Sequence, residues 1–289
     1  MTDSLSPIQN VSDTAFWVAY YRALETERPD ALFHDPLARQ LVDERAERIA
    51  ASMKATAAQT RHNVLIRTVI IDRYIQKLVT QSGVDLVVNL GAGLDTRPYR
   101  LQLPTSLRWV EVDYPHLIQF KQQRLAQERP GVLLERVQLD LADRAQRQQL
   151  FRSLSSSAAK VVILTEGVLP YLTQDQVAEL AEDLHACRNF QYWIADYISP
   201  AVYKYLQTPA RMRALKNAPF KFYPADWFGF FKTRGWSRDT VEYIGEESLK
   251  LRRSLPVPWW SYLFAPFMSK ATKQGFLRAS GYMILGRQS

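Results

Sequence analysis

The sequence predicts an α/β fold, in which helices cover both faces of a parallel sheet. From about residue 84, short apolar segments alternate with segments whose apolar residues recur at helical spacing. Such alternation is typical of successive β-α units, which build a parallel sheet. The first apolar segment runs directly into Gly91-Ala92-Gly93, and the second ends in Asp113. This layout is typical of a nucleotide or nucleoside site at the carboxyl edge of the sheet.

The region before this alternation is predicted to be helical. Ser12 or Asp13 marks one helix start, because such side chains can accept hydrogen bonds from the free amides of a first turn. Pro36 marks another, because proline has no amide hydrogen that a first turn would leave without a partner. The predicted helices cover about 13–27, 36–57 and 61–80.

The alternating region predicts strands at 85–90, 108–113, 133–139, 160–165 and 191–197, with helices at about 115–128, 143–156 and 173–188. Ser237–Ile244 and Ser280–Arg287 are predicted to form a closing strand pair. Two aromatic-rich segments, 200–235 and 245–279, interrupt the alternation and are too long for simple connections. We therefore expect them to form a cap.

Composition narrows the class of protein. A chain of 289 residues with 47% apolar content can bury a full core, which argues against disorder. The single cysteine, Cys187, excludes an internal disulfide and favours a reducing compartment. The start lacks a signal-peptide pattern, and no apolar stretch reaches the roughly 18 residues needed to span a bilayer. We expect a cytoplasmic protein without a membrane partner.

Charge and histidine spacing exclude two further classes of site. The net charge of +8 is spread along the chain without a basic run of five residues, so we interpret it as a solvated surface and expect no nucleic-acid partner. His34, His62, His116 and His185 lack metal-ligand spacing, and no metal is expected. A monomer or homodimer acting on a small molecule is expected.

The glycine turn favours S-adenosylmethionine over a dinucleotide. A dinucleotide fingerprint carries a third glycine, but here Thr96 takes that place and Asp95 stands beside it. An acid in the turn repels phosphate and suits S-adenosylmethionine, which carries a sulfonium and an ammonium but no phosphate. A nicotinamide dehydrogenase on the same sheet is therefore disfavoured. A catalytically silent protein that binds the same cofactor stays open.

Several motifs together resemble the leucine carboxyl methyltransferase family, and in particular its bacterial branch that includes the tetracenomycin polyketide carboxyl methyltransferase. They cover Asn89–Arg97, Glu111–Pro115 with Lys121, Leu139–Leu141 and Thr165–Leu172, and two N-terminal segments, Tyr21–Glu25 and Phe33–Ala38, resemble that branch as well. The resemblance spans roughly residues 15–200 and the final strand, without the cap. It implies a class I, Rossmann-like O-methyltransferase whose seven-stranded sheet has an antiparallel last strand.

The resemblance also implies roles for single residues. Arg67 would hold the cofactor carboxylate, Asp113 the ribose, Asp140 and Leu141 the adenine, and Glu166 would be a further acid of the site. The full set of expected cofactor-binding residues is Arg67, Gly91, Ala92, Gly93, Asp95, Asp113, Tyr114, Asp140, Leu141, Glu166 and Gly167. The alternatives are a surface position for Arg67, helix caps for Asp113 and Asp140, and bonds to turn amides for Asp95. Arg97 is interpreted as structural.

We expect methyl transfer by direct in-line displacement. A carboxylate acceptor is already ionised at neutral pH, so the protein would mainly align and desolvate it. A phenol with a pKa near 10 would require a base, and no histidine is placed for that role. The expected acceptor is a small, partly apolar acid of secondary metabolism such as a polyketide; a phenolic hydroxyl and a protein C-terminus are alternatives. The catalytic residues are unknown, with Tyr171, Tyr21 and Tyr197 as candidates. Residues 1–82 are expected to cover the cofactor site of a methyltransferase domain at 83–289.

Overall fold

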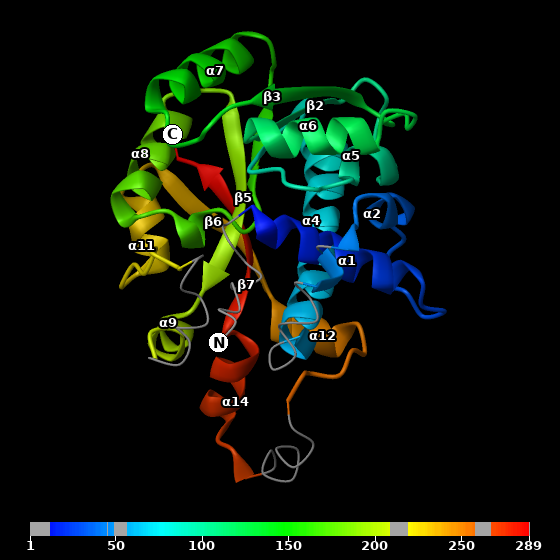
Figure 1. Ribbon diagram of the computed structural model, residues 1–289. Coiled ribbons are helices and arrows are strands. Elements are labelled where there is room, and N and C mark those ends of the chain that lie inside the picture. The colour runs from blue at the N-terminus through cyan, green and yellow to red at the C-terminus, as the bar shows by residue number, and fades with distance from the viewer. Residues whose placement is uncertain (1–11, 45, 49–56, 209–218, 258–266, 289) are drawn as a thin grey trace, which may run out of the picture.

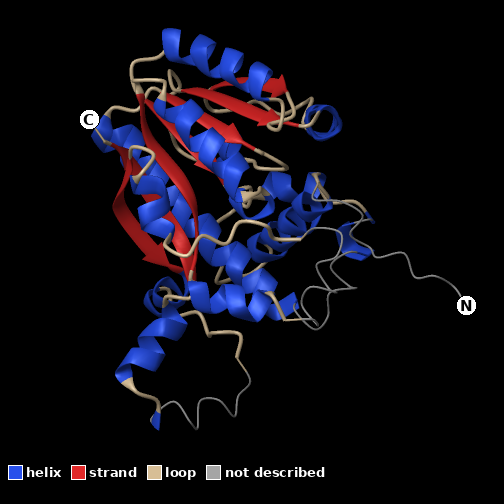
Figure 2. Ribbon diagram, turned by 90° about the vertical axis from the view of Figure 1, so that its left-hand side faces the viewer, coloured by secondary structure: helices blue, strands red, loops and turns tan. Residues whose placement is uncertain are grey.

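A seven-stranded sheet with helices on both faces forms the body of the molecule (Figures 1 and 2). The computed structural model describes residues 12–44, 46–48, 57–208, 219–257 and 267–288. The strand order is β3-β2-β1-β4-β5-β7-β6, and β7 alone runs opposite to the other six strands. The predicted sheet with an antiparallel last strand is confirmed.

Each predicted strand lies within one residue of its observed position. The observed strands are β1 Leu86–Leu90, β2 Arg108–Asp113, β3 Leu133–Gln138, β4 Val161–Thr165, β5 Phe190–Ile198, β6 Trp236–Tyr243 and β7 Ser280–Arg287. Every residue of the central strands β1 and β4 is buried. Because helices cover both of their faces, these strands consist of nearly continuous apolar residues, which is why the sequence marks them clearly.

Two apolar cores lie on opposite faces of this sheet. One contains side chains of α7 (Arg144–Ser156), α8 (Gln174–His185) and α11 (Trp227–Lys232). The other contains side chains of α4 (Ala57–Ser82) and α12 (Ile244–Lys250). A third cluster joins α1 (Asp13–Thr26) and α6 (Pro115–Arg124) to Leu94 of the glycine turn. The N-terminal helix therefore lies beside the turn that the sequence singles out.

The predicted helix over 36–57 is wrong in its extent. Helix α2 covers only Pro36–Gln40, and the chain turns at residues 41–43 before a new helical turn begins at residue 44. Asp43 Oδ1 accepts a hydrogen bond from Ala46 N at 3.0 Å, so an aspartate cap restarts the helix where the sequence has neither glycine nor proline. Residues 49–56 lie outside the described residues. Helix α4 begins earlier than predicted, at Ala57.

The first predicted cap segment contributes to the core. It contains α9 (Pro200–Leu206) and α11, and its aromatic side chains pack on the sheet face beside α8; they include Tyr203, Phe222, Trp227, Phe230 and Phe231. In the second segment, α14 (Lys270–Leu277) has no buried residue and extends from the body (Figure 1). The aromatic residues Trp259, Trp260, Tyr262 and Phe264 lie outside the described residues. Among the helices that the structure describes, none is both long and apolar enough to cross a bilayer.

Candidate functional site

The glycine turn brings its backbone close to the loop that follows β4. Gly91 has φ of +70°, and a Cβ atom built on it would lie 2.5 Å from Val168 Cγ2. A side chain is therefore excluded here by both conformation and space. The amides of Gly91 and Ala92 donate to the carbonyl of Val112, at 2.8 and 3.1 Å. The turn is thereby tied to the end of β2, where the predicted ribose acid lies.

Asp113 links this turn to the start of α6. Its Oδ2 accepts a hydrogen bond from Gly93 N at 2.6 Å, and its Oδ1 accepts one from Tyr114 N at 2.7 Å. Burial raises the pKa of the Asp113 carboxyl, with these two amides acting in the opposite direction. Each carboxylate oxygen can accept more than one bond, so both keep acceptor capacity for the two hydroxyls of a ribose.

The predicted adenine wall lies just after β3. Asp140 Oδ1 accepts a hydrogen bond from Ala142 N at 2.9 Å, while Asp143 caps α7, so Asp140 is not the helix cap. The carbonyl of Leu141 accepts a hydrogen bond from Arg147 Nη1 at 2.6 Å. The pKa of the Tyr114 phenol is raised, first by burial and then by the charge of Asp140. These interactions bring Asp140 and Tyr114 near each other at one end of the site.

A buried ion-pair network centres on Arg97, whose side chain is only 2% exposed. Its Nε lies 2.6 Å from Asp72 Oδ1, and its Nη1 lies 3.1 Å from Asp95 Oδ2 and 2.6 Å from Glu166 Oε2. Burial acts to raise the pKa of Asp95, but the charges of Arg97 and three further cations together outweigh it and lower that pKa to about 2. Asp95 also accepts hydrogen bonds from Asn89 Nδ2 and Arg97 N. Its contacts fit the alternative role of organising the turn.

Arg67 of α4 lies at the opposite end of the site from Asp140. Its Nε lies 2.8 Å from Glu166 Oε1 but makes no hydrogen bond of acceptable geometry within the described residues. Burial opposes ionisation of Glu166, yet the charges of Arg97 and Arg67 hold its pKa below the usual value. The Arg67 side chain is 18% exposed, so it is neither a free surface residue nor fully enclosed. It keeps donor capacity for a carboxylate.

Asp196 joins this group, although the sequence reasoning did not single it out. Gly167 N lies 3.2 Å from each of its carboxylate oxygens. Burial raises the pKa of Asp196 to about 6, against the opposing charge of Arg67. The sequence signal that could have identified Asp196 is the same one that identified Asp113: an acidic residue near the carboxyl end of a predicted apolar strand.

The three candidate catalytic tyrosines occupy different surroundings. Tyr171, in the 3-10 turn η1 (Leu169–Tyr171), has its pKa raised to about 12 by burial, against the charge of Arg67. Tyr21 on α1 is 4% exposed, and its hydroxyl has no hydrogen-bond partner among the described residues. Tyr197 stacks on Phe228 with ring centroids 5.3 Å apart. It follows Asp196 in β5 and so points to the other face of the sheet.

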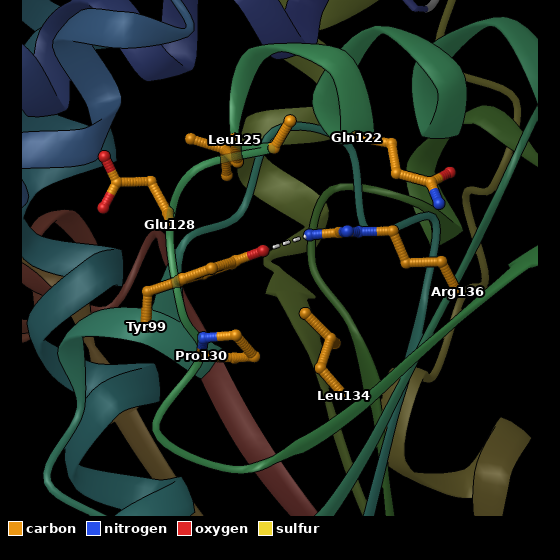
Figure 3. Close-up of a pocket in the computed structure, with 8 residues that line it drawn as sticks. Tyr99, Gln122, Leu125, Glu128, Pro130, Leu134 and Arg136 are labelled. Atoms are coloured by element: carbon orange, nitrogen blue, oxygen red, sulfur yellow. Dashed lines mark hydrogen bonds between the residues drawn. The ribbon is translucent and has the colours of Figure 1, made fainter.

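Figure 3 shows a pocket whose lining includes none of the residues described above. It is lined by Tyr99, Gln122, Leu125, Ala126, Glu128, Pro130, Leu134 and Arg136. Arg136 Nη2 donates to Tyr99 Oη at 2.5 Å and its Nε donates to Glu111 Oε2 at 3.0 Å, so these two nitrogens are already engaged. None of the expected cofactor residues lines this pocket, and we place the candidate site at the glycine turn. In the described part of the chain, no cluster of three or more His, Cys, Asp or Glu side chains could hold a metal ion.

The described residues fit the cofactor that the sequence predicts. Three groups lie around one edge of the sheet: the backbone of Gly91, the Asp113 carboxylate with spare acceptor capacity, and the Arg67 guanidinium, which has more donors than its ion pair with Glu166 uses. These groups suit a ligand with a diol at one point and a carboxylate at another.

Comparison with known proteins gives a family and a fold. Residues 15–185 match the family described as leucine carboxyl methyltransferase. A protein of Streptomyces avermitilis is 34% identical over 203 residues, which cover 64% of this chain and 69% of that protein. A protein of Streptomyces coelicolor is 35% identical over 179 residues, covering 57% of this chain and 60% of that one. Both names provisionally assign an S-adenosyl-L-methionine-dependent methyltransferase.

Two solved structures share the fold at low sequence identity. A DUF574 family protein from Streptomyces avermitilis has a TM-score of 0.57 at 15% identity, over 96% of this chain and 97% of that chain. The crystal structure of a putative methyltransferase from Thermobifida fusca also has a TM-score of 0.57 at 15% identity, over 98% of this chain and 96% of that chain. The likeness extends over nearly the whole of each chain and supports the class I fold.

Proposed function

This chain belongs to the leucine carboxyl methyltransferase family and is an S-adenosylmethionine-dependent methyltransferase, and from that premise we propose that it methylates an oxygen of a small, partly apolar acceptor, preferably a carboxylate. The observation that carries this proposal is the convergence of the Gly91 turn, Asp113 and Arg67 at the carboxyl edge of the sheet. A polyketide acid is the proposed type of acceptor. The expected cytoplasmic location and the monomeric or homodimeric state stay predictions.

The cofactor supplies an electrophilic methyl group on a sulfonium when it is bound. In the proposed site Arg67 binds the carboxylate of the cofactor's amino acid end, Asp113 binds the ribose hydroxyls, and Asp140 with Leu141 faces the adenine. Gly91 allows the backbone to approach the ligand closely. Asp95 and Glu166 contribute by holding Arg97, and through it the turn, in place.

A carboxylate acceptor would need no proton removed, because it is ionised at neutral pH. The protein would then contribute alignment and exclusion of water. We infer that the N-terminal helix α1 takes part in this task, and its contacts with the glycine turn support the inference. Ala15 Cβ lies 3.2 Å from a Cβ built on Gly93, and Arg22 Nη2 donates to the Leu94 carbonyl at 2.5 Å. Tyr171, beside Arg67, is the proposed wall of the acceptor pocket.

A phenolic acceptor is the second candidate, and Asp196 is the observation that favours it. A buried carboxyl whose pKa is raised to about 6 by burial has the basicity of a general base at neutral pH. Under this alternative, Asp196 would take the proton of the phenol as its oxygen attacks.

A methyl-labelled S-adenosylmethionine assay with aromatic carboxylic acids and polyphenols separates these candidates. Label that mild alkali releases as methanol would identify an ester and support the carboxylate proposal. Alkali-stable label would identify an ether and contradict it in favour of the phenol. If the protein binds the cofactor but labels no member of a broad panel, that result favours the silent binding protein that the sequence leaves open.

A further inference from the structure

We propose that Asp196 is a counter-ion for the ammonium group of the cofactor's amino acid end. This inference rests on the cofactor of the proposed function but is independent of the acceptor, so the two can fail separately.

Backbone register places Asp196 on the same side of the sheet as Arg67. Asp196 of β5 pairs with Tyr282 of β7, and the Tyr282 carbonyl accepts a hydrogen bond from Tyr74 of α4 at 3.0 Å. The Tyr282 side chain hydrogen-bonds Asp196, and the charge of Arg67 acts on both residues. Gly167 lies between Arg67 and Asp196. Its amide contacts the Asp196 carboxylate, and a Cβ atom built on it would lie 3.8 Å from Arg67 Nη1.

The two acids near Arg67 differ in how their charge is balanced. Glu166 Oε1 lies 2.8 Å from Arg67 Nε, and Glu166 Oε2 lies 2.6 Å from Arg97 Nη1. Each of its oxygens therefore already faces a cation. Asp196 is 6% exposed and has only an amide and a phenol as close partners, with no cationic side chain of the described chain within ion-pair distance. Burying a carboxylate without a counter-ion is costly, which is consistent with the raised pKa of Asp196.

The opposite charges of Arg67 and Asp196 match the two charges of an α-amino acid. In the cofactor's amino acid end, the carboxylate and the ammonium sit on the same carbon atom. Arg67 has further guanidinium donors beside the Nε that faces Glu166, and these can donate to the carboxylate, while Asp196 can accept from the ammonium. Binding would therefore give the buried Asp196 carboxylate a counter-ion. Glu166 would stay in place as the support of both arginines.

The test compares two ligands that differ in the amino acid end. S-adenosylhomocysteine carries that end, whereas 5′-methylthioadenosine has only the adenosine and a thioether. Calorimetric titration of the full-length Asp196→Asn variant should show S-adenosylhomocysteine affinity lowered by roughly 10- to 100-fold, the range expected for a lost charge-assisted hydrogen bond. The affinity for 5′-methylthioadenosine should change by less than about twofold. Asparagine keeps the shape of the side chain and an acceptor for Gly167 N.

Two results would overturn the inference. If Asp196→Asn binds S-adenosylhomocysteine as tightly as the wild type but loses turnover, Asp196 is the base of a phenol methyltransferase. If both ligands weaken equally, the residue shapes the site as a whole and does not contact the ammonium. Failure of the wild type to bind S-adenosylhomocysteine would instead contradict the proposed function itself.

Discussion

Arg97 Nη1 lies 2.6 Å from Glu166 Oε2, and this buried ion pair joins the helix after the glycine turn to the loop after β4. The same guanidinium contacts Asp72 of α4 through its Nε. Three segments that are far apart in the sequence are thus fixed to one side chain at the edge of the sheet. Because Arg67 and Glu166 lie on two of these segments, their spacing depends on Arg97 even though Arg97 is not expected to touch the ligand.

Replacing this residue should destabilise the fold strongly. We expect Arg97→Met to lower the free energy of unfolding by about 3–5 kcal/mol, because buried carboxylates lose their partner. Urea unfolding measures this change. The matched control is Arg48→Met, which removes an exposed ion pair with Glu44 and should cost less than about 1 kcal/mol. Similar losses for both variants would contradict the central role of Arg97.

Acid should remove part of the stability that Asp95 supplies. Arg97 and other cations lower the pKa of Asp95 to about 2, against the effect of burial. Since the folded pKa lies below the unfolded value, this contribution is complete above about pH 4 and is lost as the pH falls toward 2. Urea unfolding between pH 5 and pH 2 should show the decline. In Arg97→Met the decline should begin at a higher pH, and an unchanged profile would show that Arg97 does not hold this pKa.

Asp113 should be essential for cofactor binding. We expect Asp113→Ala to weaken S-adenosylhomocysteine binding by at least about 100-fold, because it removes the acceptors for two ribose hydroxyls and for Gly93 N. Asp143→Ala is the matched control, since Asp143 caps α7 and should affect stability without affecting the ligand. Calorimetric titration measures both affinities. Retained affinity in Asp113→Ala would mean that the site is placed wrongly.

The sequence predicts secondary structure correctly where a pattern extends over many residues. The strands were predicted to within one residue, because continuous apolar segments in β1 and β4 reflect burial on both faces. The helix expected over 36–57 was wrong because a turn closed by Asp43 leaves the apolar spacing largely intact. Helix α5 (Arg97–Arg100) was not predicted, since four residues carry no periodicity.

The charge balance of the site could not be predicted in the same way. Asp72 and Arg97 are separated by 25 positions, and Arg97 and Glu166 by 69, so their pairing depends on how the elements pack. Asp196 was overlooked for a related reason. Its importance comes from the lack of a close cation, and that lack is visible only when every neighbouring element is in place.

The Asp196→Asn variant should be more stable than the wild type near neutral pH. Burial raises the pKa of Asp196 to about 6, so the folded protein favours the protonated form. Its favourable contribution is present below about pH 4 and is lost as the pH rises through 6. At pH 7.5 we expect a gain of about 1–3 kcal/mol in the free energy of unfolding. The charged or titratable groups around Asp196 are Arg67, Glu166, Tyr171, Tyr203 and Tyr282.

Urea unfolding at pH 7.5 and pH 5 tests this expectation. The advantage of the variant should shrink at pH 5, where the wild-type carboxyl is largely protonated. If the variant is less stable than the wild type at both pH values, the charge of Asp196 is already stabilised by the protein without a ligand.

Tyr21 should prove dispensable for the fold. Its buried hydroxyl has no partner among the described residues, so Tyr21→Phe should not lower the free energy of unfolding. Tyr74→Phe is the contrast, because that hydroxyl donates to the Tyr282 carbonyl at 3.0 Å and its loss should cost about 1 kcal/mol. If Tyr21 contacts the acceptor, Tyr21→Phe should raise the acceptor KM. An unchanged KM would remove Tyr21 from the candidates.

The position of β7 has a consequence for the order of folding. This strand lies between β5 and β6, although it follows both of them along the chain. While the chain is being synthesised, the parallel part of the sheet can assemble first, but β5 keeps an open hydrogen-bonding edge until residues 280–287 arrive. An open, largely apolar edge is prone to pair with other chains. Tyr282 belongs to that strand, so the surroundings of Asp196 are completed in the same late step. If Asp196 binds the cofactor's ammonium, a nascent chain can make that contact only after its sheet has closed.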